Sequence, residues 1–111
     1  MPMELPSRFQ EKLNIDIDTI LKSAVPDITK IILFGSCSRG NIKITSDLDL
    51  LVLTKEPVNR TVRGELRAAC DDSHRKVTTD LVFYTEHDFN ASDCLLVRNI
   101  KKDGVIVWTN H

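Results

Sequence analysis

Hydrophobic and polar positions follow two different patterns along this chain. Near the N-terminus the apolar residues recur every three or four positions, which predicts an amphipathic helix. They are Phe9, Leu13, Ile17, Ile20 and Ala24. Ser7 is a candidate N-cap for this helix, and Pro26 is expected to end it.

Four shorter apolar runs predict strands. Lys30 to Phe34 is a buried strand that stops at Gly35, and Leu48 to Leu53 is a second. Val77 to Tyr84 is rich in β-branched and aromatic residues and predicts a third. Val105 to Trp108 predicts a short closing strand.

Two further helices are expected between these strands. Pro57 suits the first turn of one helix, whose apolar stripe would be Val58, Val62, Leu66 and Ala69. Thr85 can cap a final helix that ends at Gly104. Its expected core positions are Phe89, Leu96 and Ile100.

The resulting order is helix, strand, strand, helix, strand, helix, strand, which predicts an α/β or α+β fold around one small sheet. The chain has 111 residues, so we expect a single domain spanning 1–111. The order of the strands within the sheet stays open.

The amino-acid composition limits the classes of protein to which this chain can belong. The chain is 41% hydrophobic and 28% charged, which is typical of a soluble globular domain. Its net charge of −1 provides no general attraction to nucleic acid or membrane, so neither is an expected partner. No apolar run has membrane-spanning length, and Cys37, Cys70 and Cys94 suggest no disulfide framework. A cytoplasmic location is therefore expected.

Two aspartates lie at the second apolar run, Asp47 directly before it and Asp49 within it. Asp47 and Asp49 are two positions apart, so on a strand they share one face, and Asp80 lies in the third predicted strand. If the two strands are neighbours, three carboxylates could converge. Such a cluster repels itself unless a cation compensates it, and Mg²⁺ prefers oxygen ligands and commonly bridges to phosphates. A D-x-D pair alone is more often a pair of surface acids.

A phosphate-binding element could precede this cluster. Gly35 allows backbone to approach a phosphate closely, and the Ser36 hydroxyl can donate a hydrogen bond. A helical turn beginning there would offer free N–H groups to an anion, and Arg39 could pair with it.

These motifs together resemble a known family. Gly35-Ser36, ten residues, then Asp47-Leu48-Asp49 is similar to the G-S-x10-D-x-D signature of the DNA polymerase β-like nucleotidyltransferase superfamily. The segments "SRG" and "SDLDLLV" resemble its minimal nucleotidyltransferase branch, whose members often act as antitoxins beside HEPN-domain toxins. The resemblance implies a small mixed sheet flanked by helices.

The resemblance also implies roles for individual residues. Asp47, Asp49 and Asp80 would be catalytic and ligate Mg²⁺, and Asp80 could help to deprotonate the acceptor. Gly35 and Ser36 would hold the nucleotide phosphates.

The implied activity is the transfer of AMP from ATP to a hydroxyl, often a tyrosine, of a HEPN toxin in a type VII-like toxin–antitoxin pair. Two alternatives stay open: an antitoxin that neutralises its partner by binding alone, and a nucleotidyltransferase with a small-molecule acceptor. Homo- or hetero-oligomers are both compatible with the sequence.

One further feature is a basic stripe. Arg60, Arg63 and Arg67 fall at helical spacing, and they could dock an acidic partner or RNA. An ordinary solvated helix face is the simpler interpretation.

Overall fold

A computed structural model describes residues 5–35, 47–70 and 77–110. Its described helices are α1 (Ser7–Leu21), α3 (Arg60–Cys70), α4 (Glu86–Ala91) and α5 (Leu95–Asp103). Its described strands are β1 (Ile28–Phe34), β2 (Leu48–Thr54), β3 (Thr79–Thr85) and β4 (Val105–Thr109). No helix in the described ranges is long and apolar enough to cross a membrane.

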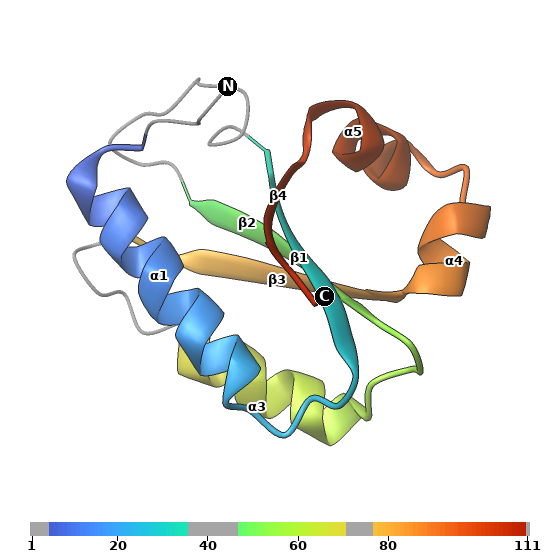
Figure 1. Cartoon of the computed structure of the whole chain (residues 1–111), viewed down its shortest axis with the longest axis horizontal. Coiled ribbons are helices and arrows are strands. Elements are labelled where there is room, and N and C mark those ends of the chain that lie inside the picture. The colour runs from blue at the N-terminus through green and yellow to red at the C-terminus, as the bar shows by residue number, and fades with distance from the viewer. Residues whose placement is uncertain (1–4, 36–46, 71–76, 111) are drawn as a thin grey trace.

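The four described strands form one mixed sheet in the order β3-β2-β1-β4 (Figure 1). β1 lies in the centre and runs antiparallel to both β2 and β4. β2 and β3 run parallel, so both begin at the same end of the sheet. The predicted class, a small mixed sheet flanked by helices, is confirmed.

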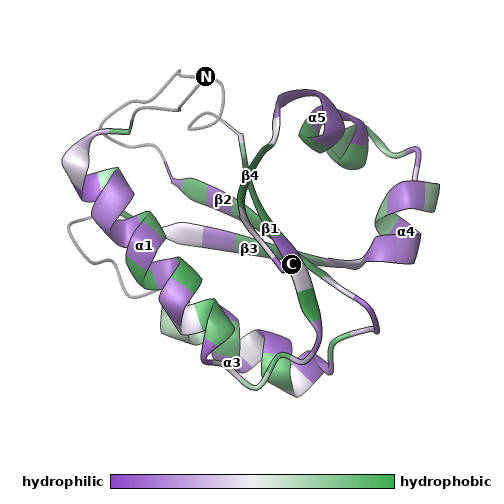
Figure 2. Ribbon diagram, in the orientation of Figure 1, coloured by the Kyte–Doolittle hydropathy of each residue, from purple (hydrophilic) through white to green (hydrophobic). Residues whose placement is uncertain are grey.

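Helices cover both faces of the sheet. α1 and α3 enclose one hydrophobic cluster, to which the strands contribute alternate residues, including Ile31, Leu33, Leu50 and Val52. α4 and α5 lie against the opposite face (Figure 1), where a second cluster contains Ile32, Leu51, Leu53, Phe89, Val97 and Ile100. Hydrophobic and hydrophilic positions alternate along α1 and α3 (Figure 2), which agrees with their amphipathic sequences.

The predicted starts of two helices were wrong. Ser7 is the first residue of α1, because the carbonyl of Pro6 already accepts hydrogen bonds from Phe9 and Gln10. α3 begins at Arg60 rather than near Pro57, since the Asn59 side chain accepts a hydrogen bond of 2.7 Å from the N–H of Thr61.

Two other features of these helices also differ from prediction. α1 ends at Leu21, before Pro26, and Ala69 is exposed on α3. Cys70 takes the core position at the end of α3 instead, where its side chain is buried.

Where the sequence predicted a single final helix, the structure has two helices, α4 and α5. Thr85 caps α4 as expected, because its hydroxyl accepts a hydrogen bond from the Asp88 N–H. The break follows at Ser92, whose own side chain accepts the N–H of Cys94 and competes with the helical ladder. The break turns α5 so that Val97 is buried and Leu96, the predicted core residue, is 39% exposed.

Gly104 ends α5 as predicted, but for a different reason. Its φ is −68°, outside the left-handed region. A side chain at this position would approach the carbonyl of Ile100 to 2.5 Å and a methyl of Ile32 to 2.7 Å. Close packing against β1 therefore explains the glycine.

Candidate active site

The parallel pairing of β2 and β3 brings two aspartates together. Asp49 and Asp80 are direct partners in the register of the two strands, and neighbouring strands lie about 4.8 Å apart. Both side chains point to the sheet face that carries α4 and α5, because they alternate with the buried Leu50 and Leu81. Both strands begin here, beyond the residues that α4 and α5 cover.

Asp47 lies one residue before β2, and its side chain contacts the chain that enters β3. The hydroxyl of Thr78 donates a hydrogen bond to its Oδ1. The Thr78 carbonyl also accepts the N–H of Leu48 at 2.9 Å, so the chain entering β3 holds the chain entering β2 through two contacts. Asp47 and Asp80 are exposed and Asp49 is half-buried, which leaves the three carboxylates accessible from solvent.

Gly35 packs directly against the Asp49 carboxylate. β1 ends at Phe34, the register partner of Asp49, and Gly35 then turns the chain with φ +76°. A Cβ at this position would lie 2.2 Å from Asp49 Oδ2. Both the left-handed backbone and the close approach require glycine here.

We expect Gly35→Ala to reduce activity by about 100-fold or more while the core stays folded. The new methyl group must displace the Asp49 carboxylate or the end of β1, and misplacement of a reacting group by 1 Å can cost about that much. The measurement is the rate of label transfer from ATP. Gly64→Ala, on the exposed face of α3 with nothing near its Cβ, is the control. Equal rates in the two variants would contradict this interpretation.

The rest of the predicted site is only partly described. Ser36 and Arg39 lie outside the described residues. Within the described ranges, no three His, Cys, Asp or Glu side chains form a ready-made metal site. Proteins usually hold Mg²⁺ through one or two carboxylates together with water and substrate phosphates. The adjacent Asp49 and Asp80, an oxygen-only donor set, fit that requirement.

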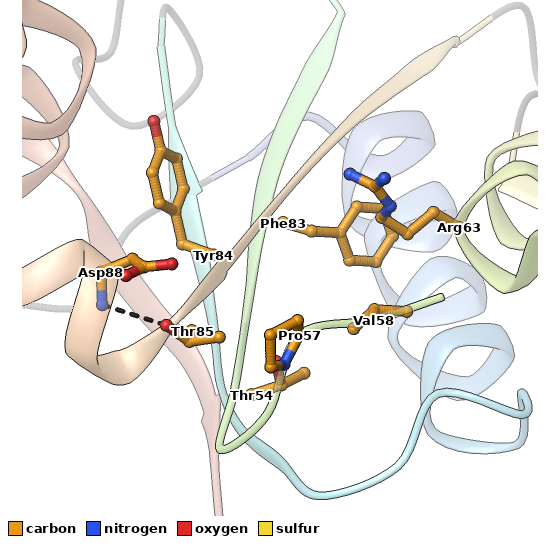
Figure 3. A pocket seen from close by; sticks show the side chains of 8 residues that line it. All are labelled: Thr54, Pro57, Val58, Arg63, Phe83, Tyr84, Thr85 and Asp88. Carbon is orange, nitrogen blue, oxygen red and sulfur yellow. Dashed lines mark hydrogen bonds between the residues drawn. The ribbon is translucent and has the colours of Figure 1, made fainter. Parts of the chain in front are cut away.

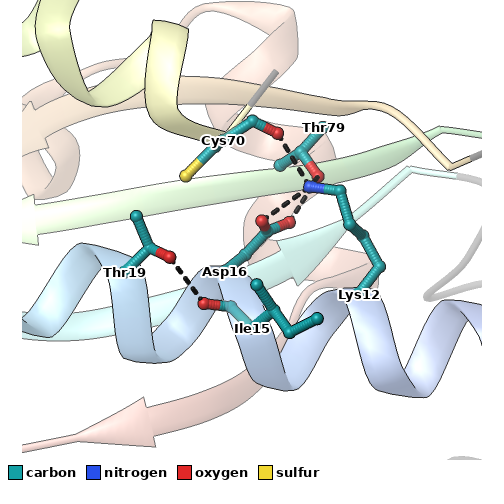
Figure 4. Close-up of polar contacts among 6 residues, drawn as sticks. All are labelled: Lys12, Ile15, Asp16, Thr19, Cys70 and Thr79. Atoms are coloured by element: carbon teal, nitrogen blue, oxygen red, sulfur yellow. Dashed lines mark hydrogen bonds and ion pairs between the residues drawn. The ribbon is translucent and has the colours of Figure 1, made fainter. Parts of the chain in front are cut away.

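A buried polar network lies behind the carboxylates, on the α1 and α3 side of the sheet (Figure 4). Lys12 and Asp16, each 1% exposed, form an ion pair with 2.6 Å between Nζ and Oδ1. Lys12 Nζ also donates to the Cys70 carbonyl at 2.7 Å and to Thr79 Oγ1 at 2.9 Å. The Thr79 hydroxyl in turn donates to Asp16. The network thus ties α1 to the end of α3 and to the residue before Asp80.

Burial dominates the electrostatics of this network. It raises the pKa of the Asp16 carboxyl, against the hydrogen bond and charge of Lys12, which lower it. Burial and the neighbouring Asp16 raise the pKa of the Cys70 thiol to about 12, so Cys70 is a packing residue at neutral pH. Lys12 and Asp16 were not predicted as functional residues from the sequence, although two opposite charges four residues apart on the apolar stripe of a helix were a usable signal.

Two cavities lie along β3. One, of about 300 Å³, is lined by Arg67, Ala68, Thr79, Asp80 and Leu81, and therefore adjoins the carboxylates. The other, of about 270 Å³, lies at the far end of the strand beside Tyr84, Thr85 and Asp88 (Figure 3). The Asp80 carboxylate thus lines open space at the start of the strand.

Paired carboxylates beside a glycine turn on a small mixed sheet are what the resemblance to nucleotidyltransferases implied. Residues 15–107 match the family described as the nucleotidyltransferase domain. This match covers most of the chain, so the chain belongs to that family.

The chain is also similar to a curated protein. The chain is 37% identical over 75 residues to the "probable protein adenylyltransferase MntA" of Haemophilus influenzae. This alignment covers 66% of the chain and 65% of the relative, so the chain matches slightly less than two thirds of the relative's length.

Two solved structures are also similar to the chain. A chain in the crystal structure of a toxin–antitoxin complex with AMP-PNP is 26% identical, with a TM-score of 0.66 over 87% of this chain and 73% of that one. A second similar structure is the complex of a tri-AMPylated Shewanella oneidensis HEPN toxin with its MNT antitoxin. It has 24% identity and a TM-score of 0.65, over 91% of this chain and 72% of that one. At that identity, the second likeness shows the fold.

Proposed function

We propose that this protein is a Mg²⁺-dependent nucleotidyltransferase that transfers AMP from ATP to a hydroxyl, such as that of a tyrosine, on a HEPN-domain toxin, and thereby acts as the antitoxin. The observation that carries the proposal is the Asp49–Asp80 pair at the start of two parallel strands, with Gly35 packed against Asp49. The similarity to an adenylyltransferase and to a complex with an AMP-PNP ligand supports adenosine nucleotides as donors.

In the proposed reaction, the acceptor oxygen attacks the α-phosphorus of ATP. An oxygen–phosphorus bond forms, the bond from the α-phosphorus to the bridging oxygen breaks, and pyrophosphate leaves with that oxygen. Bound Mg²⁺ would stabilise the charge that develops on the phosphate oxygens and on the leaving group.

Individual residues of the chain have distinct roles in the proposed reaction. Asp47, Asp49 and Asp80 would hold the metal ion, and Asp80, on the sheet edge, would also receive the proton of the acceptor hydroxyl. Gly35 allows the turn after β1 to lie against Asp49. Ser36 and Arg39 are proposed to contact the phosphates.

Thr78 should act on the site through Asp47. We expect Thr78→Val to weaken metal binding and transfer about 10- to 100-fold, as is usual when a hydrogen-bond partner of a metal ligand is lost. Thr78→Ser keeps the hydroxyl and should retain most of the activity. Mn²⁺ titration by calorimetry, beside a transfer assay, measures both effects. A Thr78→Val variant that binds Mn²⁺ like the wild type would contradict this role.

The function itself is tested by label transfer. The purified protein is incubated with α-phosphate-labelled ATP, Mg²⁺ and lysate of its own host, and an Asp80→Asn variant is run in parallel. A discrete labelled protein band that is absent with the variant would support the proposal and identify the acceptor. Absence of label, while a pull-down still recovers the partner, would favour an antitoxin that neutralises by binding alone.

A further inference from the structure

The exposed edge of the sheet beside Asp80 carries a row of arginines. β3 is one of the two edge strands of the described sheet, and α3 runs alongside it. Arg60, Arg63 and Arg67 lie at intervals of three and four residues on α3, which places them on one stripe of the helix. We name these three residues the arginine row.

Two members of the arginine row, Arg63 and Arg67, contact β3. Arg67 Nε donates to the outward carbonyl of Leu81 at 3.4 Å, and its guanidinium lies 5.3 Å from the centre of the Phe83 ring. Arg63 reaches from α3 toward the same ring (Figure 3). Arg63 and Arg67 therefore do not form the simple solvated helix face that the sequence suggested.

The arginine row forms no close ion pairs within the described residues. None of the three arginines forms an ion pair with a described carboxylate. Arg63 Nε is buried and has no hydrogen-bond partner among the described atoms. A buried donor without a partner is uncommon in proteins and calls for an explanation.

The arginine row lies near Asp80, the proposed catalytic residue on β3. Arg67 and Asp80 line the same cavity, and Arg63 lines the next cavity along β3. Asp80 and Thr85 are five residues apart, so the edge is about 17 Å long and matches an extended segment of roughly five residues. A chain lying along this edge could place one side chain at Asp80 and acidic side chains beside the arginines.

We propose that the arginine row docks an extended acidic segment of the acceptor protein and so presents its hydroxyl at Asp80. This inference rests on the proposed function for the identity of the occupant. RNA is the weaker candidate, because the guanidinium of Arg67 already covers Phe83 and leaves less ring surface on which a base could stack.

Binding can be tested independently of catalysis. The probe is a fluorescein-labelled octaglutamate peptide, and fluorescence anisotropy measures its affinity at low salt. We expect Arg60→Glu and Arg63→Gln to weaken binding about tenfold each. Arg98→Glu, an exposed arginine on α5, is the matched control and should bind like the wild type. An unlabelled RNA octamer that displaces the peptide better than unlabelled octaglutamate would overturn the choice of a protein segment.

A kinetic measurement separates docking from catalysis. With the acceptor found by label transfer, Arg60→Glu should raise KM for the acceptor about tenfold while kcat and KM for ATP stay unchanged. Wild-type protein that binds the peptide but transfers no label would refute the proposed function and leave the docking surface supported. Transfer with unaltered acceptor KM in both arginine variants would refute the docking surface alone.

Discussion

Asp80→Asn is expected to fold like the wild type and to lose at least about 1,000-fold in AMP transfer. Its side chain is exposed and lies beside Asp49 rather than in the core, so the substitution should leave stability nearly unchanged. The amide can neither offset the charge of a metal ion nor accept the acceptor proton. A loss of several kcal/mol in transition-state stabilisation corresponds to about three powers of ten in rate.

Label transfer and thermal unfolding, measured on the same preparation, check this prediction. Asp93→Asn, an exposed aspartate between α4 and α5, is the control for removing one negative charge. Wild-type turnover in Asp80→Asn would contradict a catalytic role for this residue. Protection of cells by an Asp47→Asn/Asp49→Asn double variant would show that binding alone is sufficient for the antitoxin effect.

The second large effect concerns stability. We expect Lys12→Met to lower the free energy of unfolding by about 3–5 kcal/mol, because it leaves the Asp16 carboxylate buried without its cation. Lys22→Met is a matched control on the same helix: its ion pair with Asp18 has the same spacing, but both side chains are largely exposed. That variant should change stability by less than about 1 kcal/mol. Urea unfolding measures both.

The destabilisation by Lys12→Met should also depend on pH. Without Lys12, the folded-state pKa of Asp16 rises further above the ordinary value of 3.8. The folded state then binds a proton that the unfolded state releases, so the stability of the variant falls as pH rises through the folded pKa. Unfolding at pH 5 and pH 8 measures this slope relative to the wild type. The extra slope should disappear in Lys12→Met/Asp16→Asn, and its persistence there would exclude Asp16 as the cause.

Several parts of this protein followed from local sequence. The period of the apolar residues located α1, α3 and the four described strands within a few positions, because burial on one face imposes that period, but it predicted one helix where α4 and α5 are separate. The spacing of Gly35, Asp47 and Asp49 pointed to the site, since alternation on a strand places the two carboxylates on one face. The break at Ser92 and the start of α3 at Asn59 were missed, because each depends on a single side chain bonding to backbone.

The sequence by itself determined the elements, their buried faces and the residue types available for phosphate chemistry. Only the tertiary structure decided that β3 lies parallel to β2 with Asp80 opposite Asp49, because strand pairing joins segments 31 residues apart. The tertiary structure also decided that Lys12 and Asp16 are buried against Thr79 and that the arginine row follows an open sheet edge. Local patterns report which face of an element is apolar, whereas packing alone determines which other element covers that face.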